Sequence, residues 1–273
     1  MEMSAMNQNI RIGALISGSG TNLQAIMDAC ESGQIRGRIV FIGSDNPDAE
    51  GLKRGEIFKI PSFVVDYGSI IRRFKKSPEK ITLPDDFDLN EILSKQHLFP
   101  VDADKEMTKA FFTTRAIAEA TLIDKMKNYP FDLLVLAGFM RNLTPYFIDR
   151  VNTAPNHLRI MNIHPALLPA FPGIDGYGDT FRYGCKIGGC TVHFVDYGED
   201  SGPIIGQRAY MISEDDTIES VREKGLKLEW ALYPECVKMF AEGRLKTVRI
   251  SYRLKSDKKI HRTVVKILPS PKG

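Results

Sequence analysis

The stretch Phe131-Asp132-Leu133-Leu134-Val135-Leu136-Ala137-Gly138-Phe139 decides the fold. It is an almost unbroken apolar run of strand length. Strands of this kind occur where helices cover both faces of a sheet, as they do in α/β proteins with parallel strands. The run therefore predicts a buried strand at the centre of such a sheet.

The residues before this run repeat a strand–helix rhythm. Apolar segments of strand length lie at residues 10–17, 37–44 and 61–66, and segments with helical periodicity lie at residues 23–30 and 49–58. Strands that alternate with helices predict βαβ units. We therefore predict an α/β fold, namely a Rossmann-like, open, mostly parallel twisted sheet with helices on both faces.

Two segments depart from this rhythm. Residues 67–106 mix basic and acidic runs, and we interpret them as a surface insertion, either a solvated excursion or a lid or interface element. Residues 247–273 form a basic C-terminal extension whose alternating pattern predicts a β-hairpin with a turn about residues 256–259. We expect the chain, residues 1–273, to be a single domain.

Composition excludes several classes of protein. The chain has 273 residues, 43% of them hydrophobic, and a formal net charge of +3, which does not by itself suggest nucleic acid as a partner. No apolar run approaches the roughly 20 residues of a membrane helix. The four cysteines form no Cys-x-x-Cys pair, so the sequence predicts neither a metal site nor a disulfide framework. We expect a cytoplasmic protein, either monomeric or homodimeric.

The first predicted strand runs into Gly18-Ser19-Gly20-Thr21-Asn22, and a helix follows. Backbone N–H groups at a helix start and the helix dipole favour an anion, so this turn is a candidate phosphate site. Leu23 stands where a dinucleotide fingerprint has its third glycine, which disfavours a nicotinamide cofactor. Asp45 lies where a ribose-binding acid is expected, so the spacing leaves that alternative open.

A second stretch, residues 161–173, carries polar chemistry at the end of a predicted strand. Asn162 and His164 are two residues apart, so an extended chain points both side chains to the same face. An amide beside an imidazole can polarise and protonate an oxygen that turns anionic. Taken alone, His164 fits a structural core histidine better, because lone histidines are usually structural.

Several of these segments end at the same edge of the predicted sheet. Ligands of open α/β sheets bind outside the carboxyl ends of the strands. The Gly20 turn, residues 140–143 and the stretch from Asn162 to His164 all lie at such ends. The sequence therefore predicts one shared site. Asp200, in a later turn between two strands, would orient His164 and favour its imidazolium form if it lies nearby.

Two long motifs in this order resemble the folate-dependent formyltransferase superfamily. They are Asn-x-His-Pro-x-Leu-Leu-Pro from Asn162 and Asp-x-Gly-Pro-Ile-Ile from Asp200. The glycine turn followed by Thr21-Asn22 is most similar to the branch that formylates phosphoribosylglycinamide in purine biosynthesis. In a chain of this length we expect neither the extra C-terminal domain of methionyl-tRNA formyltransferases nor the N-terminal domain of formyltetrahydrofolate deformylases.

The resemblance implies a reaction and roles for residues. The formyl group of 10-formyltetrahydrofolate would pass to the amine of 5'-phosphoribosylglycinamide through a tetrahedral intermediate, without a metal. The alternative is the same chemistry with another acceptor, a sugar-nucleotide amine or water. The implied catalytic residues are Asn162, His164 and Asp200; the implied ribonucleotide-binding residues are Gly20, Thr21, Asn22 and Glu229; and the implied folate-binding residues are Arg115, Met140, Arg141, Asn142, Leu143 and Asn162.

One part of the sequence departs from the family pattern. Asp175 and Tyr177 stand where the family has histidines. We expect Asp175 to place a second carboxylate near His164. The surrounding residues 174–179 read as a glycine-rich acidic loop, with a short helix beginning at Thr180.

Overall fold

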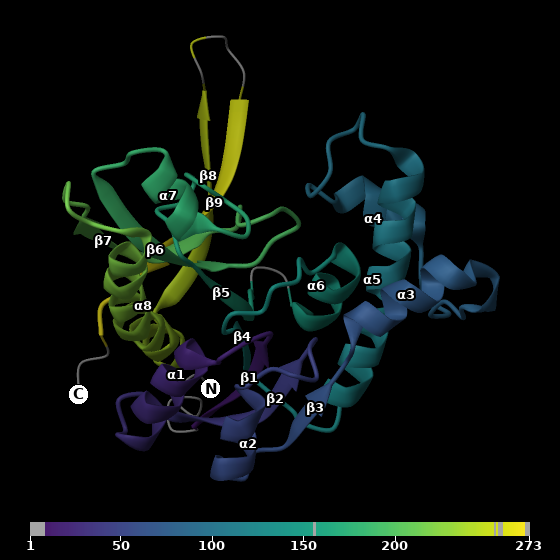
Figure 1. The fold of residues 1–273 in the computed structure, drawn as a ribbon, viewed down its shortest axis with the longest axis horizontal. Coiled ribbons are helices and arrows are strands. Elements are labelled where there is room, and N and C mark those ends of the chain that lie inside the picture. The colour runs from purple at the N-terminus through teal and green to yellow at the C-terminus, as the bar shows by residue number, and fades with distance from the viewer. Residues whose placement is uncertain (1–8, 155–156, 254, 256–258, 271–273) are drawn as a thin grey trace, which may run out of the picture.

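The computed structural model describes residues 9–154, 157–253, 255 and 259–270, and its strands form a large sheet and a separate two-stranded sheet (Figure 1). The strands of the large sheet are β1 (Ile10–Ile16), β2 (Gly37–Ser44), β3 (Ser62–Val64), β4 (Leu133–Leu136), β5 (Ile160–His164), β6 (Ile187–Phe194) and β7 (Ile204–Met211).

The order of these strands confirms the predicted fold class. Across the sheet they run β3-β2-β1-β4-β5-β6-β7; the first five are parallel, and β6 is antiparallel to both β5 and β7. The chain builds one edge from β1 to β3 and then returns to β4 beside β1. The crevice at the carboxyl ends of β1 and β4 is where such a sheet binds ligands.

Helices cover both faces of the sheet (Figure 1). They are α1 (Thr21–Glu31), α2 (Leu52–Phe58), α3 (Tyr67–Lys76), the 3₁₀-helix η1 (Pro78–Lys80), α4 (Leu89–Lys95), α5 (Lys105–Met126), α6 (Pro145–Val151), α7 (Gly176–Arg182) and α8 (Ile218–Ala241). Two apolar clusters result, one under α1 and α8 and the other under α5 and α6.

Strand β4 shows why the run from Phe131 to Phe139 is so apolar. Leu133 and Val135 belong to the cluster under α1 and α8, whereas Leu134 and Leu136 belong to the cluster under α5 and α6. Successive side chains of a strand point to opposite faces, so a strand covered on both sides needs an apolar residue at every position. Burial of each such side chain is worth about 2 kcal/mol.

The insertion at residues 67–106 lies mostly at the surface and is helical, and whether it is a solvated excursion, a lid or an interface element stays a prediction. It contains α3, η1 and α4. Ile92 of α4 is buried in a third apolar cluster with Phe112 of α5 and Tyr146 of α6. Other apolar residues of the insertion pack against the same cluster, namely Phe87, Leu89, Leu98 and Phe99. That the whole chain is one domain stays a prediction.

The predicted C-terminal hairpin is confirmed. It consists of β8 (Leu245–Arg253) and β9 (Lys259–Ile267), which pair antiparallel, and it projects from the body of the molecule (Figure 1). It begins before residue 247 because Leu245, together with Val265, packs against the core. Turn residues 256–258 lie outside the described residues. Within the described part of the chain, no helix is both long and apolar enough to cross a membrane.

Candidate active site

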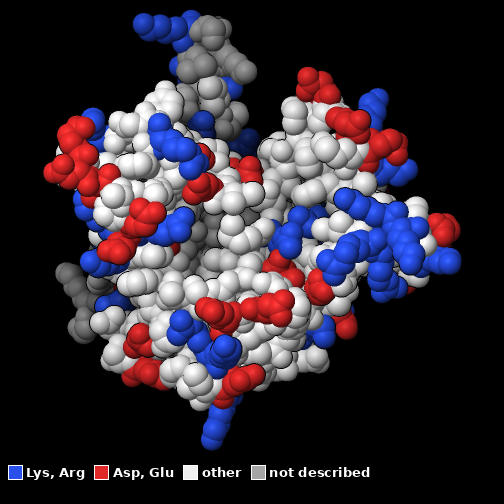
Figure 2. All heavy atoms as spheres, viewed as in Figure 1, with Lys and Arg blue, Asp and Glu red and all other residues white. Residues whose placement is uncertain are grey.

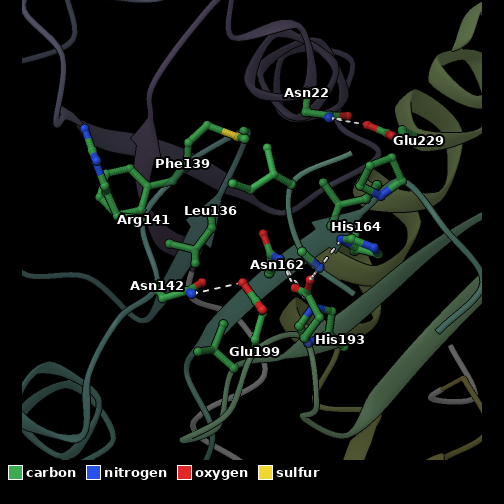
Figure 3. Close-up of a pocket in the computed structure, with 18 of the residues that line it drawn as sticks. Asn22, Leu136, Phe139, Arg141, Asn142, Asn162, His164, His193, Glu199 and Glu229 are labelled. Carbon is green, nitrogen blue, oxygen red and sulfur yellow. Dashed lines mark hydrogen bonds and ion pairs between the residues drawn. The ribbon is translucent and has the colours of Figure 1, made fainter. Parts of the chain in front are cut away.

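A cavity of about 310 Å³ lies at the carboxyl ends of the central strands. Figure 2 shows this face hollowed between the part built by α7 and α8 and the part built by α5 and α6. The cavity is lined by side chains from segments far apart in the sequence (Figure 3). Among them are Asn22, Met140, Arg141, Asn142, Leu143, Asn162, His164, Tyr177, His193, Glu199, Asp200, Arg222 and Glu229.

His164 and Asp200 form the centre of the site. His164 ends β5 and is buried, and its Nδ1 lies 3.1 Å from Oδ2 of Asp200. Its Nε2 lies 2.7 Å from the carbonyl oxygen of Phe171. Both ring nitrogens therefore face oxygen acceptors, so each N–H of an imidazolium has a partner. The juxtaposition of His164 and Asp200 is the one expected from the sequence.

Asn162 lies beside this pair because it is two residues before His164 on the same strand. Its Nδ2 lies 3.3 Å from Nε2 of His193 and 3.4 Å from Oδ1 of Asp200. Nδ1 of His193 lies 2.9 Å from the carbonyl oxygen of Phe194, and its Nε2 also lies 3.5 Å from Oδ1 of Asp200. The two N–H groups of the Asn162 amide thus face His193 and Asp200 in the free enzyme, so a ligand oxygen would take one N–H from one of these partners.

Several groups hold the Asp200 carboxylate in its ionised form. Burial alone would raise the pKa of Asp200, but His193, the charge of His164 and the Gly173 N–H together lower it below the usual value. The Gly173 N–H donates to Oδ2 over 2.9 Å. The carboxylate is therefore charged near neutral pH, which suits it to orient a protonated imidazole.

A second polar cluster lies at the far end of the cavity. Asn22, in the first turn of α1, donates from Nδ2 to Glu229 of α8 over 2.6 Å (Figure 3). The Tyr177 hydroxyl donates to the other oxygen of this carboxylate. Burial raises the pKa of Glu229, although both hydrogen bonds act in the opposite direction. Oδ1 of Asn22 is buried and has no partner among the described residues.

The segment after β4 supplies a third wall. Arg141 donates from Nε to the buried Asp45 carboxylate over 2.5 Å, and Asn142 donates to Glu199 across the cavity over 3.0 Å (Figure 3). The Ser17 hydroxyl donates to the other oxygen of Asp45 over 2.5 Å. Both oxygens of Asp45 are thus occupied, so it is poorly placed to bind a ribose.

Three predicted binding residues do not line the cavity. Gly20 and Thr21 begin α1 next to Asn22, with Gly20 in the left-handed conformation at φ 69°. Arg115 is only 8% exposed, and its guanidinium lies over the rings of Tyr67 and Phe111. Its Nε has no hydrogen-bond partner among the described residues. The binding roles of all three stay predictions.

The expectation for Asp175 was wrong. Its carboxylate pairs with Arg182 over 2.8 Å and accepts from the Gly178 N–H, and the described contacts of His164 do not include it. Asp175 is in fact the N-cap of α7, which begins at Gly176 and not at Thr180. An aspartate three residues before the capped N–H is a recognisable signal that could have placed this helix.

Sequence reasoning also missed three side chains in the cavity. His193 was overlooked because the strand around it reads as plain core, although it faces Asn162 across the β5–β6 pairing. Tyr177 was noted only as a substitution, but it binds Glu229. Arg222 lies on α8 seven residues before Glu229, two helical turns away, and that spacing could have placed both on one side of the helix.

Comparison with known proteins identifies the family. Residues 10–237 match the family model described as formyl transferase. The chain is 31% identical over 228 residues to phosphoribosylglycinamide formyltransferase of Bacillus subtilis, covering 84% of this chain and 93% of that protein. It is 34% identical over 236 residues to the same enzyme of Haemophilus influenzae, covering 86% and 89%.

A solved structure supports the same relationship. The crystal structure of glycinamide ribonucleotide transformylase 1 from Symbiobacterium toebii matches with a TM-score of 0.67 and 34% identity, covering 98% of this chain and 99% of that one. The chain is therefore an enzyme of the formyl transferase family, grouped with the phosphoribosylglycinamide formyltransferases.

Proposed function

We propose that the enzyme transfers the formyl group of 10-formyltetrahydrofolate to the amine of 5'-phosphoribosylglycinamide, a step of de novo purine biosynthesis. The observation that carries the proposal is the contact of His164 with Asp200 at 3.1 Å beside Asn162, inside a cavity that also holds Asn22 and Glu229. The names of the relatives support the choice of acceptor.

The reaction forms one carbon–nitrogen bond and breaks another. The amine nitrogen of the ribonucleotide attacks the formyl carbon, and the carbonyl electron pair moves to oxygen to give a tetrahedral oxyanion. The oxyanion then collapses and expels N10 of the folate, which takes up a proton while the attacking nitrogen loses one. One N–H of Asn162, released from His193 or Asp200, would donate to the oxyanion.

His164 would act as the general acid, with Asp200 orienting it. Nε2 of His164 is held by the carbonyl of Phe171 in the free enzyme. Donation from Nε2 to the substrate therefore requires the imidazole to exchange this carbonyl for a substrate oxygen. The bond from Nδ1 to Asp200 is independent of that exchange, so the ring keeps one fixed partner throughout.

The two ends of the cavity suit the two substrates. Asn22 lies at the start of α1 and contacts Glu229 of α8, and the helix dipole and the N–H groups of the Gly20-Thr21 turn there would hold the ribose phosphate. Residues 140–143 would line the pterin slot at the other end. Arg115 lies outside the lining of this cavity and its Nε is buried, so contact with the folate carboxylate would require this side chain to move.

A formyl-transfer assay tests the proposal. Purified enzyme with 10-formyltetrahydrofolate should consume the donor only when 5'-phosphoribosylglycinamide is present, and the product should be the formylated ribonucleotide. Enzyme-dependent loss of the donor in buffer without any amine acceptor would support water as the acceptor. Loss that depends on a sugar-nucleotide amine would support the remaining alternative.

A substitution at Glu229 should separate the two substrates. Glu229→Gln removes one of the two oxygen acceptors that hold Asn22 and Tyr177. We expect the KM for the ribonucleotide to rise about tenfold, equivalent to about 1.4 kcal/mol of lost binding, while the KM for the folate changes little. Steady-state kinetics with each substrate varied in turn measure this. Glu223→Gln, at an exposed position of the same helix, is the matched control. Equal changes for both substrates would contradict the assignment.

A further inference from the structure

We propose that the insertion positions the catalytic aspartate. A strut, residues 95–99, holds an acidic loop, residues 196–201, in the shape that brings Asp200 to His164. The inference rests on the proposed role of Asp200 and assigns positioning roles to Lys95, His97 and Tyr197. None of these side chains lines the cavity.

The strut is fixed to the body of the molecule by aromatic packing. The ring of Phe99 meets those of Phe111 and Phe112 of α5 edge to face, with centroids 4.9 Å and 5.8 Å apart. The Gln96 side chain closes the turn, because its Oε1 accepts from the N–H groups of Leu98 and Phe99 over 2.9 Å and 2.8 Å. Edge-to-face aromatic pairs add stability beyond the burial of their surface area, so the strut is a rigid support.

The strut reaches the acidic loop through its backbone. The His97 N–H donates to the Tyr197 carbonyl over 2.8 Å, and His97 pairs with Gly198 as a parallel bridge. A Cβ at Gly198 would lie 2.4 Å from Oγ of Ser201, within the loop itself, and at an ordinary contact distance of 3.4 Å from Cβ of His97. The contact is therefore two or three residues from Asp200 and needs no particular side chain at position 97.

A second tie runs through side chains. Lys95 donates to Asp149 of α6 over 2.8 Å, and the Tyr197 hydroxyl donates to the other oxygen of the same carboxylate. Burial and this bond raise the pKa of Tyr197 to about 12, so the hydroxyl stays a donor over the neutral range. Asp149 thus links the strut and the loop.

The loop needs external support because its backbone is strained. Asp200 has φ 48°, in the left-handed region that residues with a Cβ rarely adopt. Such a conformation costs about 1–3 kcal/mol and persists only where surrounding contacts hold it. On the cavity side the loop is contacted by Asn142, and on the opposite side by the strut and Asp149. Releasing the strut should let Asp200 relax away from His164.

The test compares two substitutions at one position. His97→Pro removes the N–H that binds Tyr197, whereas His97→Ala keeps it. Gln96 already has φ −68° and ψ 146°, the extended conformation that a following proline requires, so the proline variant should fold. We expect kcat of His97→Pro to fall about tenfold and its pH–rate profile to shift, with His97→Ala close to the parent in both.

A nuclear magnetic resonance titration of the His164 imidazole in the same proteins gives a second readout that needs no turnover. If the parent enzyme fails to formylate the ribonucleotide, the proposed function fails, but the titration still tests the strut. The other charged or titratable side chains that line this cavity, which must be assigned alongside, are Asp200, His193, Glu199, Glu229, Arg141, Arg222 and Tyr177.

Identical titration curves and kcat values for His97→Pro and His97→Ala would overturn the inference. Tyr197→Phe removes only the hydroxyl of the second tie and should shift the same titration in the same direction. If His97→Pro does not fold, the Tyr197→Phe variant decides the question. An unchanged titration in Tyr197→Phe would then refute the strut.

Discussion

Replacing His164 by alanine is expected to lower kcat about a thousandfold, because one positioned proton donor is typically worth 10²–10⁴ in rate. The substitution leaves Asp200 its bond from Gly173 and its proximity to Asn162 and His193, so the carboxylate keeps partners in the folded state. We therefore expect an intact fold, and KM values within a few-fold of the parent for both substrates. Steady-state formyl transfer and circular dichroism measure these effects.

The control for this variant is His261→Ala. His261 lies on the exposed hairpin strand β9, where it contacts Ser251, and it should have no effect on turnover. Retention of more than about a tenth of the parent kcat by His164→Ala would be incompatible with general acid catalysis at this position, given the size that such effects have. The oxyanion would then depend on Asn162 alone.

The parts of this molecule that follow a periodic pattern were predictable. Every position of β4 is apolar because the strand is covered on both faces, so the run itself reveals the architecture. Asn162 and His164 share a face because side chains two residues apart on a strand point to the same side. The sequence spacing therefore predicts their proximity. Asp200 was predictable only through its motif, since no local rule brings residues 164 and 200 together.

The parts that depend on backbone atoms or on irregular turns were not predictable. The carbonyl of Phe171 that meets Nε2 of His164 could not be inferred, because every residue has a carbonyl and only the path of the turn selects this one. Asp175 was expected beside His164 and instead caps α7, because the nearest free N–H groups and Arg182 compete for its carboxylate. The insertion packs on α5, and the composition of the insertion alone does not indicate which element it packs against.

A buried carboxyl group next to the cavity should make stability depend on pH. Glu119 of α5 is fully buried and accepts from the backbone N–H of Thr144 over 2.8 Å and from its hydroxyl over 2.5 Å. Thr144 is the N-cap of α6 and directly follows the segment that lines the cavity, residues 140–143. Glu119 therefore anchors one wall of the proposed folate site.

Burial raises the pKa of Glu119 from 4.5 to about 7, although the Thr144 hydrogen bonds oppose the shift. The folded state then binds more protons than the unfolded state between these two values, so stability falls as pH rises through that interval. This one group should account for about 3 kcal/mol of the decline. The sign is opposite to that of Asp200, whose lowered pKa stabilises the fold above its unfolded value.

Glutamine at this position mimics the protonated acid, since its oxygen can accept from the Thr144 N–H and its amide can donate to the hydroxyl. Glu119→Gln should exceed the parent in free energy of unfolding by less than about 1 kcal/mol at pH 5 and by about 3 kcal/mol at pH 8. Glu119→Leu, which leaves the buried Thr144 groups without an acceptor, should lose about 2–3 kcal/mol at pH 5. Urea unfolding of the three proteins at both pH values measures these differences. A constant gap between parent and glutamine variant would mean that Glu119 keeps one protonation state throughout, and the wall at Thr144 would then be held by a charge rather than by a neutral acid.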